Sequence, residues 1–155
     1  MNERRLNVYL ASGWFTPMQK EVMDKVRNVL LEFSSFNVFA PFYEGVVLDK
    51  SNDSQKKRAE VFKVNTDAII ECDLMVAVID DFDPGTIFEM GVAWGIGDCM
   101  WPAIVAYSDV PGRGLNVMLA QACVGFANGA DMLREKLKRL EKLIDAPEEW
   151  SGEAT

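Results

Sequence analysis

LMVAVI (Leu74–Ile79) is an unbroken apolar run with charged residues on both sides, Asp73 before it and Asp80 after it. A strand that faces water on one side alternates apolar and polar residues, whereas this run has no polar position. Such continuity is typical of a strand that helices cover on both faces of a parallel sheet. The stretch therefore predicts the central strand of an α/β domain.

The segments on either side of this run alternate between strand-like and helix-like patterns. Further strands are predicted at Leu6–Ala11, Phe36–Ala40, Pro102–Ala106 and Ala122–Phe126. Helices are predicted at Pro17–Phe33, Lys56–Glu71, Pro84–Gly97 and Asp131–Ile144, with a short helix near Asn116. In helix 56–71, the side chains expected to point inward are Ala59, Phe62, Ala68 and Ile69. The alternation predicts an α/β fold, a doubly wound (flavodoxin-like) five-stranded parallel sheet with helices on both faces and strand order 2-1-3-4-5.

The bulk composition indicates one globular domain. The chain has 155 residues, of which 49% are hydrophobic and 26% are charged, as in an ordinary soluble protein. We expect residues 1–145 to form a single domain. Residues 146–155 are acidic and contain a glycine, so we expect them to form a flexible tail.

The net charge of −8 disfavours two classes of partner. Nucleic-acid backbones and anionic membrane surfaces both attract proteins with a surplus of Lys and Arg. No apolar run approaches the roughly 18 residues of a membrane span, and the N-terminus lacks the pattern of a targeting signal. Cys72, Cys99 and Cys123 form no CxxC pair, so we expect reduced, mostly buried thiols in a cytoplasmic protein. A small molecule is the expected partner.

The chain contains no histidine. Catalysis by Ser-His-Asp or Cys-His groups is therefore excluded, and acid–base chemistry must use carboxylates, tyrosine or lysine. Asp80 and Asp81 suggest a metal site, but histidine ligands and a spaced acidic loop pattern are both missing. We expect neither a metal nor a cofactor.

In a sheet of order 2-1-3-4-5, ligands bind beyond the carboxyl ends of the strands, where the strand order reverses. This places the loop Ser12–Phe15 opposite the loop Asp80–Gly85. Asp83 stands at the cap position of the following helix, and Glu89 lies about a turn and a half into it among apolar neighbours. Both carboxylates are candidates for chemistry; the alternative is that Asp83 only caps the helix and Glu89 only faces solvent.

Three aromatic residues near this position allow two interpretations each. Tyr9 in the first strand is either a core residue with a hydrated hydroxyl or a hydrogen-bond donor to a carboxylate of the facing helix. Trp14 and Phe15 either stack on a flat base or cover the edge of the sheet.

Four motifs together resemble the nucleoside 2-deoxyribosyltransferases. They are YLASGWF at 9–15, ECDLMVA at 71–77, D-x-G-x-x-x-E-x-G at 83–91, and N-x-M at 116–118. Each motif alone is weakly specific, but their order and spacing match the family from about residue 6 to residue 126. The doubly wound fold of that family agrees with the sheet predicted above.

The resemblance implies a role for each matching residue. Glu89 would be the nucleophile that attacks C1′ of the deoxyribose, so that a second base replaces the first with retained configuration and water replaces it slowly. Tyr9 would position Glu89, and Asp83 would contact the sugar or the base. Asn116 and Met118 would reach the site of a neighbouring subunit, which implies at least a homodimer.

The remaining substrate contacts are expected from Gly13, Trp14, Phe15, Asn65 and Gly85. Asn65 departs from the pattern, because some members carry there an aspartate that is thought to protonate the leaving base. An asparagine can hydrogen-bond a base but cannot act as its general acid. The C-terminal tail also differs from the family ending in which the terminal carboxylate joins the site.

Two alternatives remain open. A 2′-deoxynucleoside 5′-phosphate N-hydrolase of the same superfamily would need an arginine near the first strand, and Arg113 is the only evident loop candidate. A catalytically inactive module that binds a nucleoside or nucleotide is the second alternative. The presence of Tyr9, Asp83 and Glu89 together favours an enzyme that uses nucleosides and free nucleobases.

Overall fold

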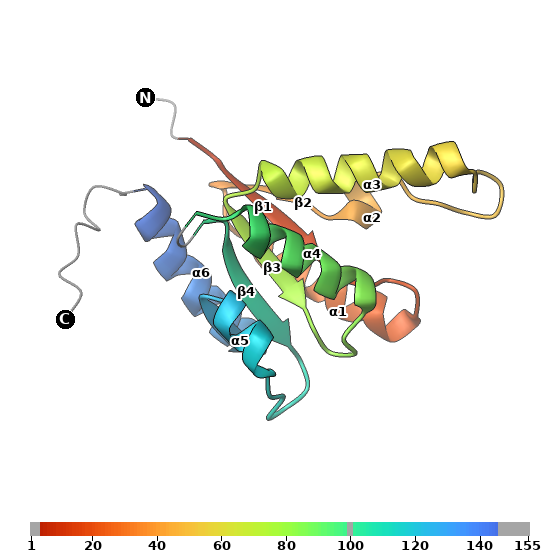
Figure 1. Cartoon of the computed structure of the whole chain (residues 1–155). Helices are drawn as coiled ribbons and strands as arrows, with labels where there is room; N and C mark the ends of the chain where they lie inside the picture. The colour runs from red at the N-terminus through yellow and green to blue at the C-terminus, as the bar shows by residue number, and fades with distance from the viewer. Residues whose placement is uncertain (1–3, 99–100, 146–155) are drawn as a thin grey trace.

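The computed structural model describes residues 4–98 and 101–145. Its centre is a five-stranded, all-parallel sheet in the order β2-β1-β3-β4-β5. The strands are β1 (Leu6–Ala11), β2 (Phe36–Phe39), β3 (Leu74–Val78), β4 (Ala103–Ser108) and β5 (Gly125–Asn128). The predicted α/β class, the parallel pairing and the strand order are thereby confirmed (Figure 1).

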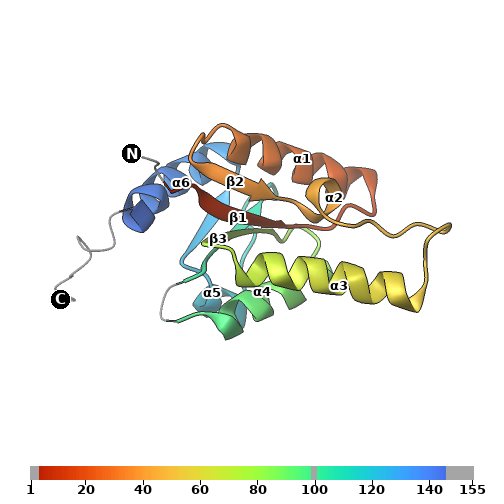
Figure 2. The same cartoon turned by 90° about the horizontal axis from the view of Figure 1, so that it is seen from above.

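Helices cover both faces of the sheet (Figure 2). They are α1 (Pro17–Leu31), α2 (Pro41–Glu44), α3 (Gln55–Ile70), α4 (Pro84–Ile96), α5 (Val117–Ala122) and α6 (Ala130–Asp145). One face packs against α1 and α6, and the other packs against α3, α4 and α5. Within the described residues, no helix combines the length and apolarity that crossing a membrane requires.

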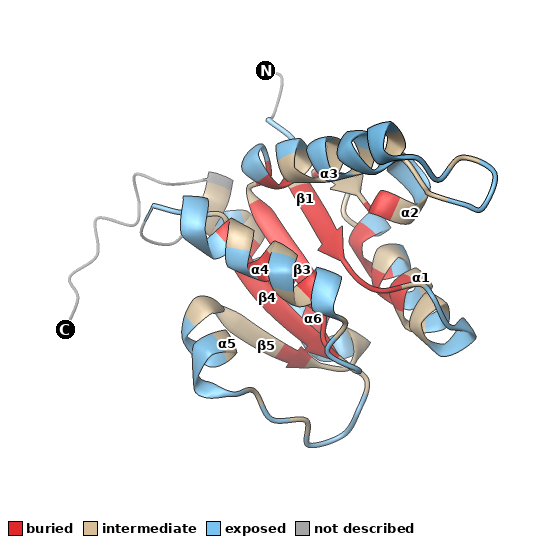
Figure 3. Ribbon diagram, turned by 45° about the vertical axis from the view of Figure 1, so that its right-hand side comes forward, coloured by how far each residue is buried: buried red, intermediate tan, exposed pale blue. Residues whose placement is uncertain are grey.

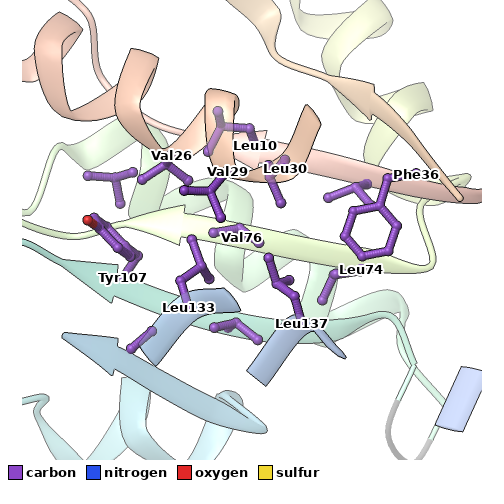
Figure 4. Packing of buried hydrophobic residues seen from close by; sticks show 14 of the residues in the cluster. Leu10, Val26, Val29, Leu30, Phe36, Leu74, Val76, Tyr107, Leu133 and Leu137 are labelled. Atoms are coloured by element: carbon purple, nitrogen blue, oxygen red, sulfur yellow. The ribbon is translucent and has the colours of Figure 1, made fainter. Parts of the chain in front are cut away.

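Every residue of β3 is buried, as its unbroken apolar sequence predicts (Figure 3). Successive side chains of a strand point to opposite faces, so β3 contributes to two cores. Leu74, Val76 and Val78 join the cluster beneath α1 and α6 (Figure 4). Met75 and Ala77 join the cluster beneath α3 and α4. The parallel pairing of β1 with β3 places the carboxyl ends of the two strands side by side at the switch point.

The structure differs from the sequence-based expectations in the following details. The helix α2, a single turn after Pro41, was not predicted. Strand β5 begins at Gly125, because Ala122 is the last residue of α5. In α3, Ile69 is buried and Ala68 half-buried, but Ala59 and Phe62 are exposed, because the sheet contacts only the C-terminal turns of this helix. The predicted tail and Cys99 lie outside the described residues.

Candidate active site

Tyr9 and Glu89 form the centre of the candidate site. The alternation of β1 directs Val8 and Leu10 towards α1 and Tyr9 towards α4. The Tyr9 hydroxyl donates a hydrogen bond to Glu89 Oε1 at 2.8 Å, which links residues 80 positions apart. The ring of Tyr9 is fully buried and stacks on Phe39 of β2, with ring centroids 5.6 Å apart. The buried and stacked Tyr9 ring therefore fixes the position of its hydroxyl, which in turn holds one oxygen of the Glu89 carboxylate.

The surroundings of Glu89 favour its protonated form. Burial raises the pKa of Glu89 from its usual 4.5 to about 7, and the nearby charge of Asp83 adds to the rise. The Tyr9 hydrogen bond opposes this effect because it stabilises the ionised carboxylate. The same burial and the same carboxylate raise the pKa of Tyr9, so the phenol stays a donor at neutral pH. A carboxylate that titrates near neutrality is typical of groups that take part in chemistry.

Asp83 caps α4, as its position directly before the helix predicts. Its Oδ2 accepts hydrogen bonds from the Thr86 amide at 2.9 Å and from the Thr86 hydroxyl at 3.2 Å. Thr86 is buried, and sequence analysis did not identify it. A Cβ at position 85 would lie 3.1 Å from Asp83 Oδ2, so a side chain there would crowd the capping carboxylate. The cap also contributes a negative charge close enough to affect Glu89.

The two aromatic residues of the β1–α1 loop have different surroundings. Trp14 is half-buried and packs against Phe42, with ring centroids 5.9 Å apart, at the margin of the core beneath α1. Phe15 contacts Trp14 at 5.2 Å but remains 72% exposed. Trp14 therefore packs at the margin of the core, whereas the ring of Phe15 is exposed.

Comparison with known proteins identifies the family. The sequence profile described as nucleoside 2-deoxyribosyltransferase matches residues 8–138. The chain belongs to the nucleoside 2-deoxyribosyltransferase family. The resemblance inferred from the four motifs is confirmed. Members of this family are pentosyltransferases that act on nucleosides and nucleobases.

Solved structures of similar proteins agree with this assignment. A 2-deoxyribosyltransferase from the psychrotolerant bacterium Bacillus psychrosaccharolyticus is similar with a TM-score of 0.72 at 25% sequence identity, over 83% of this chain and 90% of that one. A conserved protein from Enterococcus faecalis V583 is similar with a TM-score of 0.71 at 19% identity, over 88% and 99% of the respective chains, which shows the fold alone. A search of curated protein sequences found no match.

Asn65 lies on α3, one turn beyond Phe62, whose ring contacts Phe88 of α4 at 6.1 Å. The side-chain oxygen of Asn65 is buried and has no hydrogen-bond partner. A buried acceptor without a partner is costly, so this oxygen is suited to a donor that arrives with a ligand.

Asn116 and Met118 lie at the start of α5, on a different element from Tyr9 and Glu89. The side chain of Asn116 caps α5 by accepting a hydrogen bond from the Leu119 amide at 3.0 Å, and Met118 is 75% exposed. Helix α4 lies between α3 and α5, so α5 is on the opposite flank of α4 from β1 (Figure 1). The fold brings together Tyr9, Asp83 and Glu89, while the side chain of Asn116 is bound within its own helix.

Gly13 is buried, and the amide group of Gln19 packs against it. A Cβ at this position would lie 2.9 Å from Gln19 Nε2. Among the described residues, no three Cys, Asp or Glu side chains are grouped so that they could hold a metal ion. The side chains described at the site carry carboxylates, amides and aromatic rings.

Proposed function

We propose that this protein exchanges the nucleobase of 2′-deoxynucleosides through a covalent deoxyribosyl ester of Glu89. The observation that carries the proposal is the buried Tyr9–Glu89 hydrogen bond at the switch point of a family fold. Residues 1–145 would act as one catalytic domain. The free thiols of Cys72 and Cys123 suit a reducing compartment such as the cytoplasm, where base salvage would be the role.

The reaction requires two displacements at C1′. The ionised carboxylate of Glu89 attacks C1′, the C1′–N bond breaks, and its electron pair leaves with the base, which takes up a proton. A second base then attacks C1′ and loses a proton, and the ester bond to Glu89 breaks. Two inversions give retained configuration and regenerate the carboxylate. Water in place of the second base gives slow hydrolysis.

The described residues support this chemistry. Tyr9 holds one oxygen of Glu89 and leaves the other free for attack. A deoxyribose lacks the 2′-hydroxyl, so its oxocarbenium-like transition state forms more easily and more room remains beside the carboxylate. Phe15 would stack on the base, while Asn65 and Asp83 would hydrogen-bond the base or sugar. Asn65 cannot donate a proton to the base as an acid.

The 5′-phosphate hydrolase alternative receives less support. Arg113, its candidate phosphate ligand, donates a hydrogen bond to the carbonyl of Asp80 and lies over the ring of Phe82 at 4.9 Å. One nitrogen of the guanidinium is thus engaged by the protein, while its buried Nε has no hydrogen-bond partner. The carboxylates of Asp80 and Asp81 also line this edge of the sheet and would repel a phosphate dianion. A neutral nucleoside suits these surroundings better.

A second copy of the chain would complete the site. The layer of α3, α4 and α5 exposes large apolar side chains, namely Phe62, Phe88, Trp94, Val117 and Met118. Gly91 and Gly95 on α4 face open space, which allows a close approach of another helix. Exposed apolar surface of this kind marks interaction sites. In a homo-oligomer, this surface would bring Asn116 of one chain to Glu89 of another.

Subunit complementation tests that arrangement. Asn116→Ala is expected to raise KM for deoxynucleosides about tenfold, because a contact to the sugar is lost. An equal mixture of Asn116→Ala and Glu89→Gln chains should recover about a quarter of wild-type activity at low substrate, since mixed dimers contain one intact site in two. Each variant mixed with itself is the control. Absence of recovery after dissociation and reassembly would show that Asn116 does not act across subunits.

Product analysis by liquid chromatography tests the proposed function itself. One reaction contains a 2′-deoxynucleoside and a different free base, and the other contains the 2′-deoxynucleoside 5′-monophosphate alone. A new deoxynucleoside in the first reaction, with one deoxyribosyl group on the peptide that contains Glu89, is the expected result. Release of base only from the monophosphate would establish the hydrolase instead. No product in either reaction would favour a binding module.

A further inference from the structure

The loop between β3 and α4 has a backbone that its own sequence disfavours. Phe82, directly before the cap residue Asp83, has φ of 51°. Bulky residues rarely adopt this left-handed conformation, and it persists only where surrounding contacts impose it. The position of Asp83, and through it the start of α4, therefore depends on what holds this loop.

Packing does not hold the loop on the side of α1. A cavity of about 440 Å³ separates α1 from the loops that follow β3 and β4. Its lining includes Gly13, Gln19, Asp81, Val110 and Pro111. Because this space is not filled by side chains, individual hydrogen bonds must link the loops across it.

Gln19 provides that link on the side of β1. Its Oε1 accepts hydrogen bonds from the amides of Phe15 at 2.8 Å and Thr16 at 3.1 Å. Its Nε2 donates a hydrogen bond to Asp81 Oδ2 of the β3–α4 loop. One side chain thus joins the loop that carries Phe15 to the loop that leads to Asp83. The glycine at position 13 allows Gln19 to pass between them.

The opposite side of the same loop is fastened by the β4–α5 loop. The Oδ1 of Asp80 accepts hydrogen bonds from the amides of Asp109 at 3.0 Å and Val110 at 3.3 Å. Arg113 donates to the carbonyl of Asp80 and lies over the ring of Phe82. Gln19 is therefore the contact that ties this already anchored loop to the β1–α1 loop.

We propose that Gln19 is a positioning residue of the transferase site, which sets the separation of Phe15 and Asp83 through its hydrogen bond to Asp81. This inference rests on the proposed function. The hydrogen bonds of the Gln19 side chain go to Phe15, Thr16 and Asp81, and none of them goes to Glu89. A deoxynucleoside held between the two loops would bind less well when the link is broken, while the Tyr9–Glu89 pair would keep its geometry.

Gln19→Glu tests this role because it changes only one of the contacts. A glutamate at this position of a capping box still accepts from the amides of Phe15 and Thr16. It cannot donate to Asp81, and the two carboxylates repel each other. We expect KM for the deoxynucleoside to rise about fivefold to tenfold, with kcat within about twofold of wild type. Hydrogen exchange of the amides in 80–87 should become roughly tenfold faster.

Adding Asp81→Asn to this variant should reverse both effects. The asparagine introduced at position 81 can donate to the carboxylate introduced at position 19, so the link returns with the donor and acceptor exchanged, and the net charge equals that of wild type. Asp81→Asn alone should keep KM near wild type, since two amides can still pair. Asn28→Asp, which adds the same charge at an exposed position of α1, is the matched control and should change neither readout.

Each outcome decides a separate point. Unchanged hydrogen exchange of the amides in 80–87 in the Gln19→Glu variant would show that Gln19 does not hold the loop, and it would overturn the proposal. Faster hydrogen exchange with an unchanged KM would overturn the positioning role. A raised KM that the added Asp81→Asn substitution does not restore would overturn it as well. If wild type does not exchange nucleobases, the proposed function fails. The hydrogen-exchange rates of the amides in 80–87 then decide by themselves whether Gln19 holds the loop.

Discussion

Glu89→Gln is expected to reduce base exchange by about 10⁴-fold or more, because an amide cannot form the ester intermediate. The substitution keeps the size of the side chain and an oxygen that can accept the Tyr9 hydrogen bond. Binding of the deoxynucleoside should therefore remain within about an order of magnitude of wild type. The measurements are initial rates of exchange and the dissociation constant from calorimetric titration.

Glu135→Gln on α6 is the matched control for this variant. Glu135 is exposed and pairs with Arg139 on the other face of the sheet, so its loss should leave exchange unchanged. A Glu89→Gln protein with wild-type turnover would remove Glu89 from the mechanism. A protein that neither turns over nor binds would point to a damaged site.

The stability of Glu89→Gln should separate these cases. The pKa of Glu89 is raised from 4.5 to about 7, so the folded state holds the proton more tightly than the unfolded state. Its contribution to stability is complete below pH 4.5 and is lost as pH rises through about 7. Glutamine does not titrate, so the free energy of unfolding of the variant should exceed that of wild type by about 3 kcal/mol at pH 8 and match it near pH 4. Urea unfolding at the two pH values measures this difference.

Tyr9→Phe is expected to lower kcat/KM roughly 30-fold at pH 7 and to move the pH dependence. In wild type, kcat/KM should rise with pH and level off above about 7, as Glu89 becomes ionised. The Tyr9 hydrogen bond stabilises the ionised carboxylate, so its loss raises the pKa of Glu89 further. The rising limb of the profile should therefore shift to higher pH, and part of the lost activity should return there.

Tyr43→Phe is the control for this prediction. The Tyr43 hydroxyl also donates to a carboxylate, Asp24, at 2.6 Å, but the pair is exposed and lies away from Glu89. Tyr43→Phe should change neither kcat/KM nor its pH dependence. A Tyr9→Phe protein whose profile coincides with that of wild type would show that the phenol does not affect the ionisation of Glu89.

The sequence by itself determined the five strands, the longer helices and their order. Leu74–Ile79 is apolar at every position, so burial on both faces follows from local composition. The cap of α1 is also local, because Thr16 and Gln19 are three residues apart, and so is Asp83 with Thr86. Motifs of this kind were sufficient to identify the family and to select Tyr9, Asp83 and Glu89 as candidates.

Only the tertiary structure decided which of these groups meet. The Tyr9–Glu89 and Gln19–Asp81 hydrogen bonds join residues 80 and 62 positions apart, and no local pattern specifies their geometry. Phe62 was expected inside because helical periodicity reports that a face is apolar, not what covers it. The pKa of Glu89 likewise depends on burial in the folded chain, on the Tyr9 hydrogen bond and on the charge of Asp83. Local interactions determine the helices and strands, whereas contacts between residues far apart in the sequence form the site.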